Sequence, residues 1–222
     1  MLDRGSNNCY NLRVKTKIFI DFDGTIFNTL AFRDKMFEVF TMAGFSEEEI
    51  KNTYAAESLD YTYSPEGQFE RLKKIHEFDV SRARLRMDKH INSSPAYLFD
   101  DFVPFIKNLN REEYEVDLIT LGDIDFQKAK VINSGIVSSF DNVYYCDIQK
   151  DIFLSDIVDL NEKFIIVDNR ADALEKIAKK YKRSFPIFID RVQKDLDDPA
   201  LLNQVKFTGI SVKSMKQAAQ YL

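Results

Sequence analysis

The sequence is poor in cysteine, histidine, glycine and proline. Its 222 residues include only two cysteines, Cys9 and Cys146, and two histidines, His76 and His90. These are too few for a disulfide framework or for a zinc site built on Cys and His. The seven glycines and five prolines lie well below average usage, which favours long elements with few tight turns. A β-sandwich, a collagen-like chain and a linker-rich chain are therefore excluded.

The sequence also lacks long apolar runs and an excess of positive charge. No run approaches the roughly 18 apolar residues that a membrane span needs. The 31 Lys and Arg residues against 36 Asp and Glu give a net charge of −5, whereas nucleic-acid-binding surfaces are strongly basic. Residues 1–14 contain no apolar signal-peptide core, and we interpret them as a short leader. We expect a cytoplasmic monomer or homodimer that binds neither nucleic acid nor membranes.

Apolar and aromatic residues are abundant, at 45% and 13% of the chain, which is enough for a sizeable core. Short apolar runs alternate with helix-length segments, a pattern typical of a parallel sheet with right-handed crossovers. We therefore predict a three-layer, Rossmann-like α/β fold, with a last strand from Phe207 and a last helix over 212–222. The main strands are predicted at residues 15–21, 115–121, 142–146, 164–168 and 185–190.

About 90 residues separate the first two strands, and they contain helix signals but no comparable strand. Ser46 and Glu49 form a capping box, and Ser64 precedes a proline at a first helical position, so helices should begin near 47 and 65. Other helices are predicted over 30–42, 81–91 and 99–109, the last shortened or kinked by Pro104. We expect a helical domain at 30–100 inserted into a core of residues 1–29 and 101–222.

The first strand ends in the sequence DFDGT, residues 21–25. Ligands bind at the carboxyl ends of strands in open α/β sheets, and the period of two places Asp21 and Asp23 on the same side. Two such carboxylates repel unless they share a proton or a cation, and Mg²⁺ is the natural solution. A calcium-binding EF-hand is excluded because Ile26 and Phe32 occupy the positions that require Gly and Glu.

Four motifs in order resemble those of the haloacid dehalogenase superfamily. The first is DFDGT, the second is Thr120 in LITLGD, the third is Lys150 in CDIQKD, and the fourth is Asp168 in FIIVDNRAD. They span residues 21–172, and each lies at or just after a predicted strand end. The resemblance implies a hydrolase whose helical cap follows the first motif. It also implies the phosphatase branch, because dehalogenases do not carry an acid at the position of Asp23.

The resemblance implies a role for each motif residue. Asp21 would attack phosphorus and form an aspartyl-phosphate, and Asp23 would act first as general acid and then as general base. Thr120, with Gly122, would bind the phosphoryl oxygens. Lys150 would neutralise charge on Asp21 and on the transferring group.

Alternatives exist for the lysine and for the metal ligands. Lys128 lies on the helix after the second motif and is the alternative to Lys150. In the fourth motif Asn169 stands where some relatives have a second acid, which leaves Asp172 as a contact to the metal or its waters, or as a favourable charge at a helix N-terminus. The residues predicted to hold Mg²⁺ are Asp21, Asp23 through its carbonyl, Asp168 and Asp172.

These motif residues favour a Mg²⁺-dependent phosphomonoester hydrolase acting on a small phosphorylated metabolite. A phosphomutase and a catalytically silent phospho-ligand-binding protein are the alternatives, and the intact set of motif residues opposes the silent one. The cap would close over the site and supply specificity. Its candidate substrate contacts, each of which has core packing or surface charge as its alternative role, are Tyr61, Tyr63, Arg71 and Lys73.

Overall fold

The computed structural model describes residues 15–58, 63–191 and 207–222; the leader and Tyr61 lie outside them. These residues contain a six-stranded, all-parallel sheet in the order β3-β2-β1-β4-β5-β6. The predicted α/β class and Rossmann-like parallel sheet are confirmed. The strands are β1 (Thr16–Asp21), β2 (Tyr114–Leu121), β3 (Asn142–Cys146), β4 (Phe164–Asp168), β5 (Ser184–Ile189) and β6 (Ile210–Val212).

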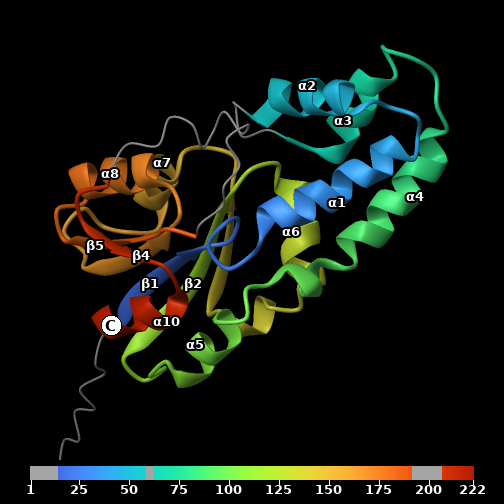
Figure 1. Ribbon diagram of the computed structural model, residues 1–222. Coiled ribbons are helices and arrows are strands. Elements are labelled where there is room, and N and C mark those ends of the chain that lie inside the picture. The colour runs from blue at the N-terminus through green and yellow to red at the C-terminus, as the bar shows by residue number, and fades with distance from the viewer. Residues whose placement is uncertain (1–14, 59–62, 192–206) are drawn as a thin grey trace, which may run out of the picture.

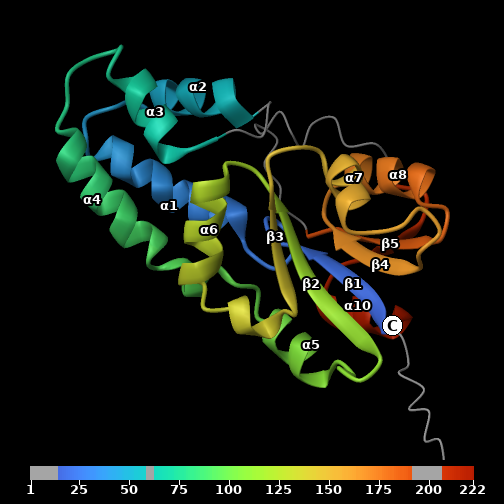
Figure 2. The ribbon, with the colours of Figure 1, turned by 180° about the vertical axis from the view of Figure 1, so that it is seen from behind.

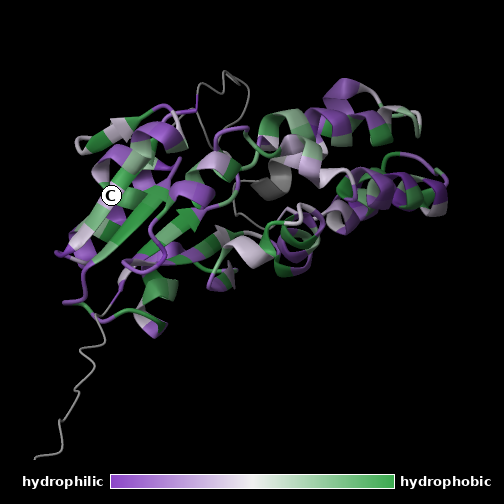
Figure 3. Cartoon of the chain, turned by 90° about the horizontal axis from the view of Figure 1, so that it is seen from below, coloured by the Kyte–Doolittle hydropathy of each residue, from purple (hydrophilic) through white to green (hydrophobic). Residues whose placement is uncertain are grey.

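Helices cover both faces of this sheet and make three layers (Figure 1). One face packs against α5 (Phe102–Asn108), α6 (Ile124–Asn133) and α10 (Met215–Ala218), and the other against α7 (Lys150–Phe153) and α8 (Ala171–Lys180). The strands are mostly apolar, whereas the helices carry both polar and apolar residues (Figure 3). Strand order reverses between β1 and β4, so a ligand site is expected at their carboxyl ends.

The insertion after β1 is helical, with α1 (Thr29–Thr41), α2 (Glu47–Ser58), α3 (Pro65–Leu72), α4 (Val80–Ile91) and the 3-10 helix η1 (Ser94–Tyr97). The predicted starts follow from capping: the amide of Ser46 donates to Glu49 Oε2 at 2.8 Å, and Ser64 Oγ accepts from the amide of Gly67 at 3.2 Å. Helices α1 and α4 lie beside each other and reach α6 of the core (Figure 2).

The chain enters and leaves this insertion at one place. Phe27 and Leu98 form an antiparallel bridge, and the amide of Asn28 donates to the carbonyl of Tyr97 at 2.7 Å. The two linkers are thus hydrogen-bonded to each other at the base of the helical domain.

Two predicted helices differ from the structure. Helix α5 begins at Phe102 instead of residue 99, and Pro104 falls in its first turn, where an amide has no helical acceptor, so the helix is not kinked. The last helix does not begin at Val212, because that residue ends β6 and Ser214 caps α10 two residues later. Three further 3-10 turns are η2 (Val137–Ser139), η3 (Leu154–Asp156) and η4 (Ala219–Tyr221). In the described residues, no helix combines the length and apolarity needed to cross a membrane.

Strand β2 buries a carboxyl group away from the strand ends. Asp117 is fully buried, and its Oδ1 accepts from the amide and the side chain of Asn142 at 3.0 and 2.9 Å. Its Oδ2 has no hydrogen-bond partner among the described residues. Burial raises the pKa of Asp117 to about 6; the Asn142 side chain opposes this rise, and the charge of Glu115 adds to it.

We expect Asp117→Asn to stabilise the protein above pH 6. The folded state holds the Asp117 proton more tightly than the unfolded chain, in which an aspartate has a pKa of about 3.9, so wild-type stability falls as pH rises through about 4 to about 6. A neutral Asn avoids this cost. Urea titration should show an unfolding free energy about 1–2 kcal/mol higher at pH 8 and little changed near pH 4.

The matched control is Asp100→Asn, on an exposed turn, which should change stability by less than about 0.5 kcal/mol at either pH. An Asp117→Asn protein that is less stable than wild type at pH 8 would show that the carboxylate is satisfied in solution.

Candidate active site

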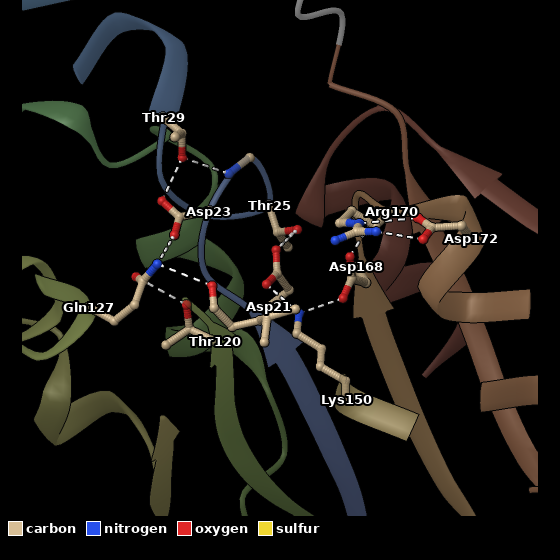
Figure 4. A network of polar contacts seen from close by, with 12 residues as sticks. Asp21, Asp23, Thr25, Thr29, Thr120, Gln127, Lys150, Asp168, Arg170 and Asp172 are labelled. Atoms are coloured by element: carbon tan, nitrogen blue, oxygen red, sulfur yellow. Dashed lines mark hydrogen bonds and ion pairs between the residues drawn. The ribbon is translucent and has the colours of Figure 1, made fainter. Parts of the chain in front are cut away.

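Two carboxylates share one ammonium at the carboxyl ends of β1 and β4 (Figure 4). Lys150 Nζ lies 2.5 Å from Asp21 Oδ1 and 2.6 Å from Asp168 Oδ2. All three residues are buried, at 4%, 5% and 0% exposure for Lys150, Asp21 and Asp168. Lys150 reaches the site because it begins α7 directly after the loop that follows β3. The structure thus brings three of the four predicted motifs into contact.

This arrangement leaves negative charge in excess. Burial raises the pKa of Asp21 to about 7; Lys150 opposes the rise, and the charge of Asp168 adds to it. For Lys150, burial lowers the pKa, but Asp168 and Asp21 together raise it above its ordinary value, so the ammonium stays charged. One positive charge therefore serves two buried carboxylates, which favours a further cation at this place.

The turn after β1 orients Asp21. Thr25 Oγ1 donates to Asp21 Oδ2 at 2.7 Å, so each oxygen of the carboxylate has a fixed partner. Gly24 makes this turn with a φ of 73°, a conformation that favours glycine. A Cβ there would lie 2.1 Å from the side-chain nitrogen of Asn169, so Asn169 packs directly against the turn.

Asp23 has a different set of partners. Lys130 Nζ lies 2.6 and 2.8 Å from its two oxygens, Thr29 Oγ1 donates to Oδ1 at 2.7 Å, and Gln127 Nε2 donates to Oδ2 at 2.8 Å. Burial alone would raise the pKa of Asp23, but Lys130, Thr29 and Gln127 together lower it below its ordinary value. Asp21 and Asp23 are thus paired with different lysines, Lys150 and Lys130.

The second motif is joined to Asp23 through Gln127. Thr120 is fully buried, and its hydroxyl donates to Gln127 Oε1 at 3.2 Å. The amide of Gly122 donates to the carbonyl of Cys146 at 2.9 Å, and the contact of this residue to substrate stays a prediction. A Cβ on Gly122 would lie 2.6 Å from Gln127 Nε2, so this glycine makes room for the Gln127 side chain.

Sequence reasoning missed Lys130 and Gln127. The structure buries residues 127, 130, 131 and 134 on one side of α6 and its C-cap, but Val131 alone of the four is apolar, so hydrophobic periodicity gave no signal for this buried face. Lys128, the alternative to Lys150, is exposed and lies 5.8 Å from the ring of Tyr145.

The fourth motif contains an ion pair of its own. Arg170 donates to both oxygens of Asp172, at 3.1 and 2.5 Å, and its amide donates to Asp168 Oδ1 at 2.7 Å. The Asp172 carboxylate is therefore bound by a guanidinium beside the site, and its contact to a metal or its waters stays a prediction that requires this pair to open.

The donors at the strand ends fit Mg²⁺. Within the part of the chain that is described, no three acidic, His or Cys side chains are grouped so as to enclose a metal by themselves. Mg²⁺ does not need such a cage, because it keeps several waters and takes one or two carboxylates together with substrate phosphates. The Asp21 and Asp168 carboxylates, with the Asp23 carbonyl, would provide that set.

Arg191, which lies just after β5, hydrogen-bonds to the DFDGT turn. Its guanidinium donates to the carbonyl of Thr25 at 3.0 and 3.1 Å and to Asp101 at 2.8 and 2.9 Å, and it lies 4.2 Å from the ring of Phe99. This residue links the end of β5, the DFDGT turn and the return linker of the insertion.

The cap candidates have structural partners. The Tyr63 ring packs against Phe126 of α6 at 5.7 Å and its hydroxyl donates to Gln68 at 2.7 Å, whereas Lys73 pairs with a neighbouring glutamate on the surface. Arg71 donates to the carbonyl of Thr53 at 2.8 Å. Tyr63 thus contacts α6, the helix that carries Gln127 and Lys130.

Several solved structures of haloacid dehalogenase-like hydrolases share this architecture. A haloacid dehalogenase-like hydrolase from Burkholderia xenovorans superposes with a TM-score of 0.67 at 16% identity, over 93% of this chain and 96% of that one. The HAD-hydrolase YfnB from Bacillus subtilis, bound to magnesium, gives 0.64 at 12% identity over 94% and 98%. The L-2-haloacid dehalogenase from Xanthobacter autotrophicus, with chloropropionic acid covalently bound, gives 0.64 at 14% identity over 93% and 98%.

The chain therefore has the fold of the haloacid dehalogenase-like hydrolases, as its four motifs predicted. No protein-family model and no curated protein sequence matches it.

Proposed function

We propose that this protein is a Mg²⁺-dependent phosphomonoester hydrolase of the haloacid dehalogenase-like class, acting on a small phosphorylated metabolite. The observation that carries the proposal is the pairing of a buried Asp21, held by Lys150 and Thr25, with a second acid, Asp23, on the same turn. A dehalogenase has no use for the second acid, whereas phosphoryl transfer to and from an aspartate uses it twice.

In the first step an Asp21 oxygen attacks phosphorus, the bond from phosphorus to the ester oxygen breaks, and the departing oxygen takes a proton from Asp23. In the second step water attacks the same phosphorus, Asp23 accepts its proton, and Asp21 is released with inorganic phosphate. In the structure Asp23 is a carboxylate bound to Lys130, which suits the second step; the first requires it to gain a proton before the alcohol leaves.

Lys150 would neutralise charge on Asp21 and on the transferring group, and the Thr120 hydroxyl would bind a phosphoryl oxygen. For this the hydroxyl must turn from Gln127 to the substrate. Mg²⁺ bound by Asp21, Asp168 and the Asp23 carbonyl would supply further positive charge against the phosphoryl oxygens.

Metal dependence and substrate class are tested together. We expect the wild-type protein to release inorganic phosphate from at least one compound in a panel of sugar phosphates, nucleotides and p-nitrophenyl phosphate in the presence of Mg²⁺. An excess of chelator should lower that rate by at least about 100-fold, because two buried carboxylates and a phosphoryl group would then share Lys150 alone.

The same panel, with 2-chloropropionate added, separates the alternatives. An isomeric sugar phosphate without free phosphate indicates a phosphomutase, and halide released from 2-chloropropionate indicates a dehalogenase. Binding of a phosphorylated compound without turnover indicates the silent protein. Phosphate release that is equal in Mg²⁺ and in chelator would contradict the metal dependence but not the hydrolase.

A further inference from the structure

A lysine is buried beside Asp23 in an aromatic surrounding. Lys130 is 3% exposed, and its ammonium contacts both Asp23 oxygens at 2.6 and 2.8 Å. It also lies 4.9, 5.5 and 5.7 Å from the ring centres of Phe126, Phe22 and Phe27. Lysine is almost never fully buried unless it is paired, and aromatic faces attract an ammonium. The three rings therefore add to the attraction that holds the ammonium beside Asp23.

The Asp23 carboxylate, which Lys130 binds, lies between the helical insertion and α6 of the core. Asp23 lies on the turn that leads from β1 into the helical domain, and its side chain is 23% exposed. Thr29, the first residue of α1, binds it from the side of the insertion at 2.7 Å, and Gln127 and Lys130 bind it from α6 of the core. Without α6, only the first turn of the inserted domain would hold this side chain.

Stability is a weak reason for such a pair. Removing two charges from water costs about as much as their attraction returns, and an apolar residue among three phenylalanine rings would pack at least as well. Precise placement is a better reason, because a reacting group displaced by about 1 Å can cost about 100-fold in rate.

We propose that Lys130 is a positioning residue that fixes the Asp23 carboxylate for its proton transfers. The proposal rests on the function proposed above. In the step that hydrolyses the aspartyl-phosphate, the water oxygen bonds to phosphorus, its proton passes to Asp23, and the bond between phosphorus and the Asp21 oxygen breaks. Gln127, one turn earlier on α6, assists Lys130 in this placement.

The test uses Lys130→Met, which keeps an unbranched side chain among the rings and removes the ammonium. With p-nitrophenyl phosphate, whose leaving group departs without a proton from Asp23, we expect kcat to fall about 10- to 100-fold and KM not to rise. The fraction of chains that carry a phosphoryl group after acid quench, measured by intact mass, should increase. A crystal structure of the variant should show the Asp23 carboxylate turned away from α6.

The exposed neighbour gives the matched control, since Lys128→Met should leave kcat and the phosphorylated fraction unchanged. An unchanged kcat, or an unmoved Asp23 in the crystal structure, would overturn the proposal. If the wild-type protein hydrolyses no phosphoester but Asp23 turns away in Lys130→Met, the hydrolase function fails and the placement of Asp23 by Lys130 stands. If Lys130→Met does not fold, Lys130→Gln replaces it: a loss of kcat with Asp23 turned away supports the proposal, and an unchanged kcat overturns it.

Discussion

Asp21→Asn is expected to lower the rate of phosphate release by about 10⁴-fold or more, because an amide cannot replace the carboxylate oxygen as nucleophile. The protein should stay folded, since the substitution keeps the shape of the side chain and an acceptor for the Thr25 hydroxyl. It also removes one of the two buried negative charges that share Lys150. The midpoint of thermal unfolding should therefore not fall by more than a few degrees.

The measurement is phosphate release in Mg²⁺ from the best compound of the panel, with intact mass to detect the phosphorylated chain. Asp100→Asn, the same chemical change on an exposed turn, should behave as wild type. An Asp21→Asn protein that keeps its fold and turns over within tenfold of wild type would mean that Asp21 is not the nucleophile. The aspartyl-phosphate route would then be wrong.

Lys150→Met should have the largest effect on stability. It leaves the buried carboxylates of Asp21 and Asp168 without a cation, and such a broken buried pair typically costs about 3–5 kcal/mol. The loss should be measured by urea titration at pH 8 in chelator. It should be smaller at pH 5, because Asp21, whose pKa is already about 7 with Lys150 present, is then protonated and one charge fewer is buried.

Activity should fall in the same variant by about 10²–10³-fold, the usual effect of removing one electrostatic contact to a transferring group. Lys128→Met again provides the control and should cost less than about 0.5 kcal/mol. If Lys150→Met unfolds at the same urea concentration as wild type, water reaches the two carboxylates in solution, and the charge argument for a metal at this place is lost.

The strands and the chemistry at their ends could be predicted because both depend on local sequence. A short apolar run that ends in Asp is visible without any knowledge of the fold, which is why β1 and β4 and their terminal acids were found. Periodicity locates the strands and their carboxyl ends, whereas the choice of Lys150 and Asp168 as site residues rests on their resemblance to the third and fourth haloacid dehalogenase motifs. The position of Lys150 ahead of a helix at the end of a strand favoured it over Lys128.

Lys130 could not be assigned in the same way, because its partner Asp23 is 107 residues away and a lysine on a helix is usually solvated. Its neighbours on the same side of the helix include the polar Gln127 and Ser134, so the spacing of apolar residues does not mark Lys130 as buried. The environment of Asp172 was equally out of reach, since Arg170, two residues before it, can pair with it only once the turn is formed. The role of Gly122 in making room for the Gln127 side chain was also not visible in the sequence, and its contact to substrate stays a prediction.

The bridge between Phe27 and Leu98 brings the two ends of the helical insertion together. Because its two ends already meet, lengthening or shortening the segment between them costs little closure entropy, only about 0.6 kcal/mol per doubling of length. The register of β1 with β2 and the position of Asp21 do not depend on the length or sequence of the insertion. Natural variation can therefore change the length of this segment while Asp21 and Asp168 stay where the sheet holds them.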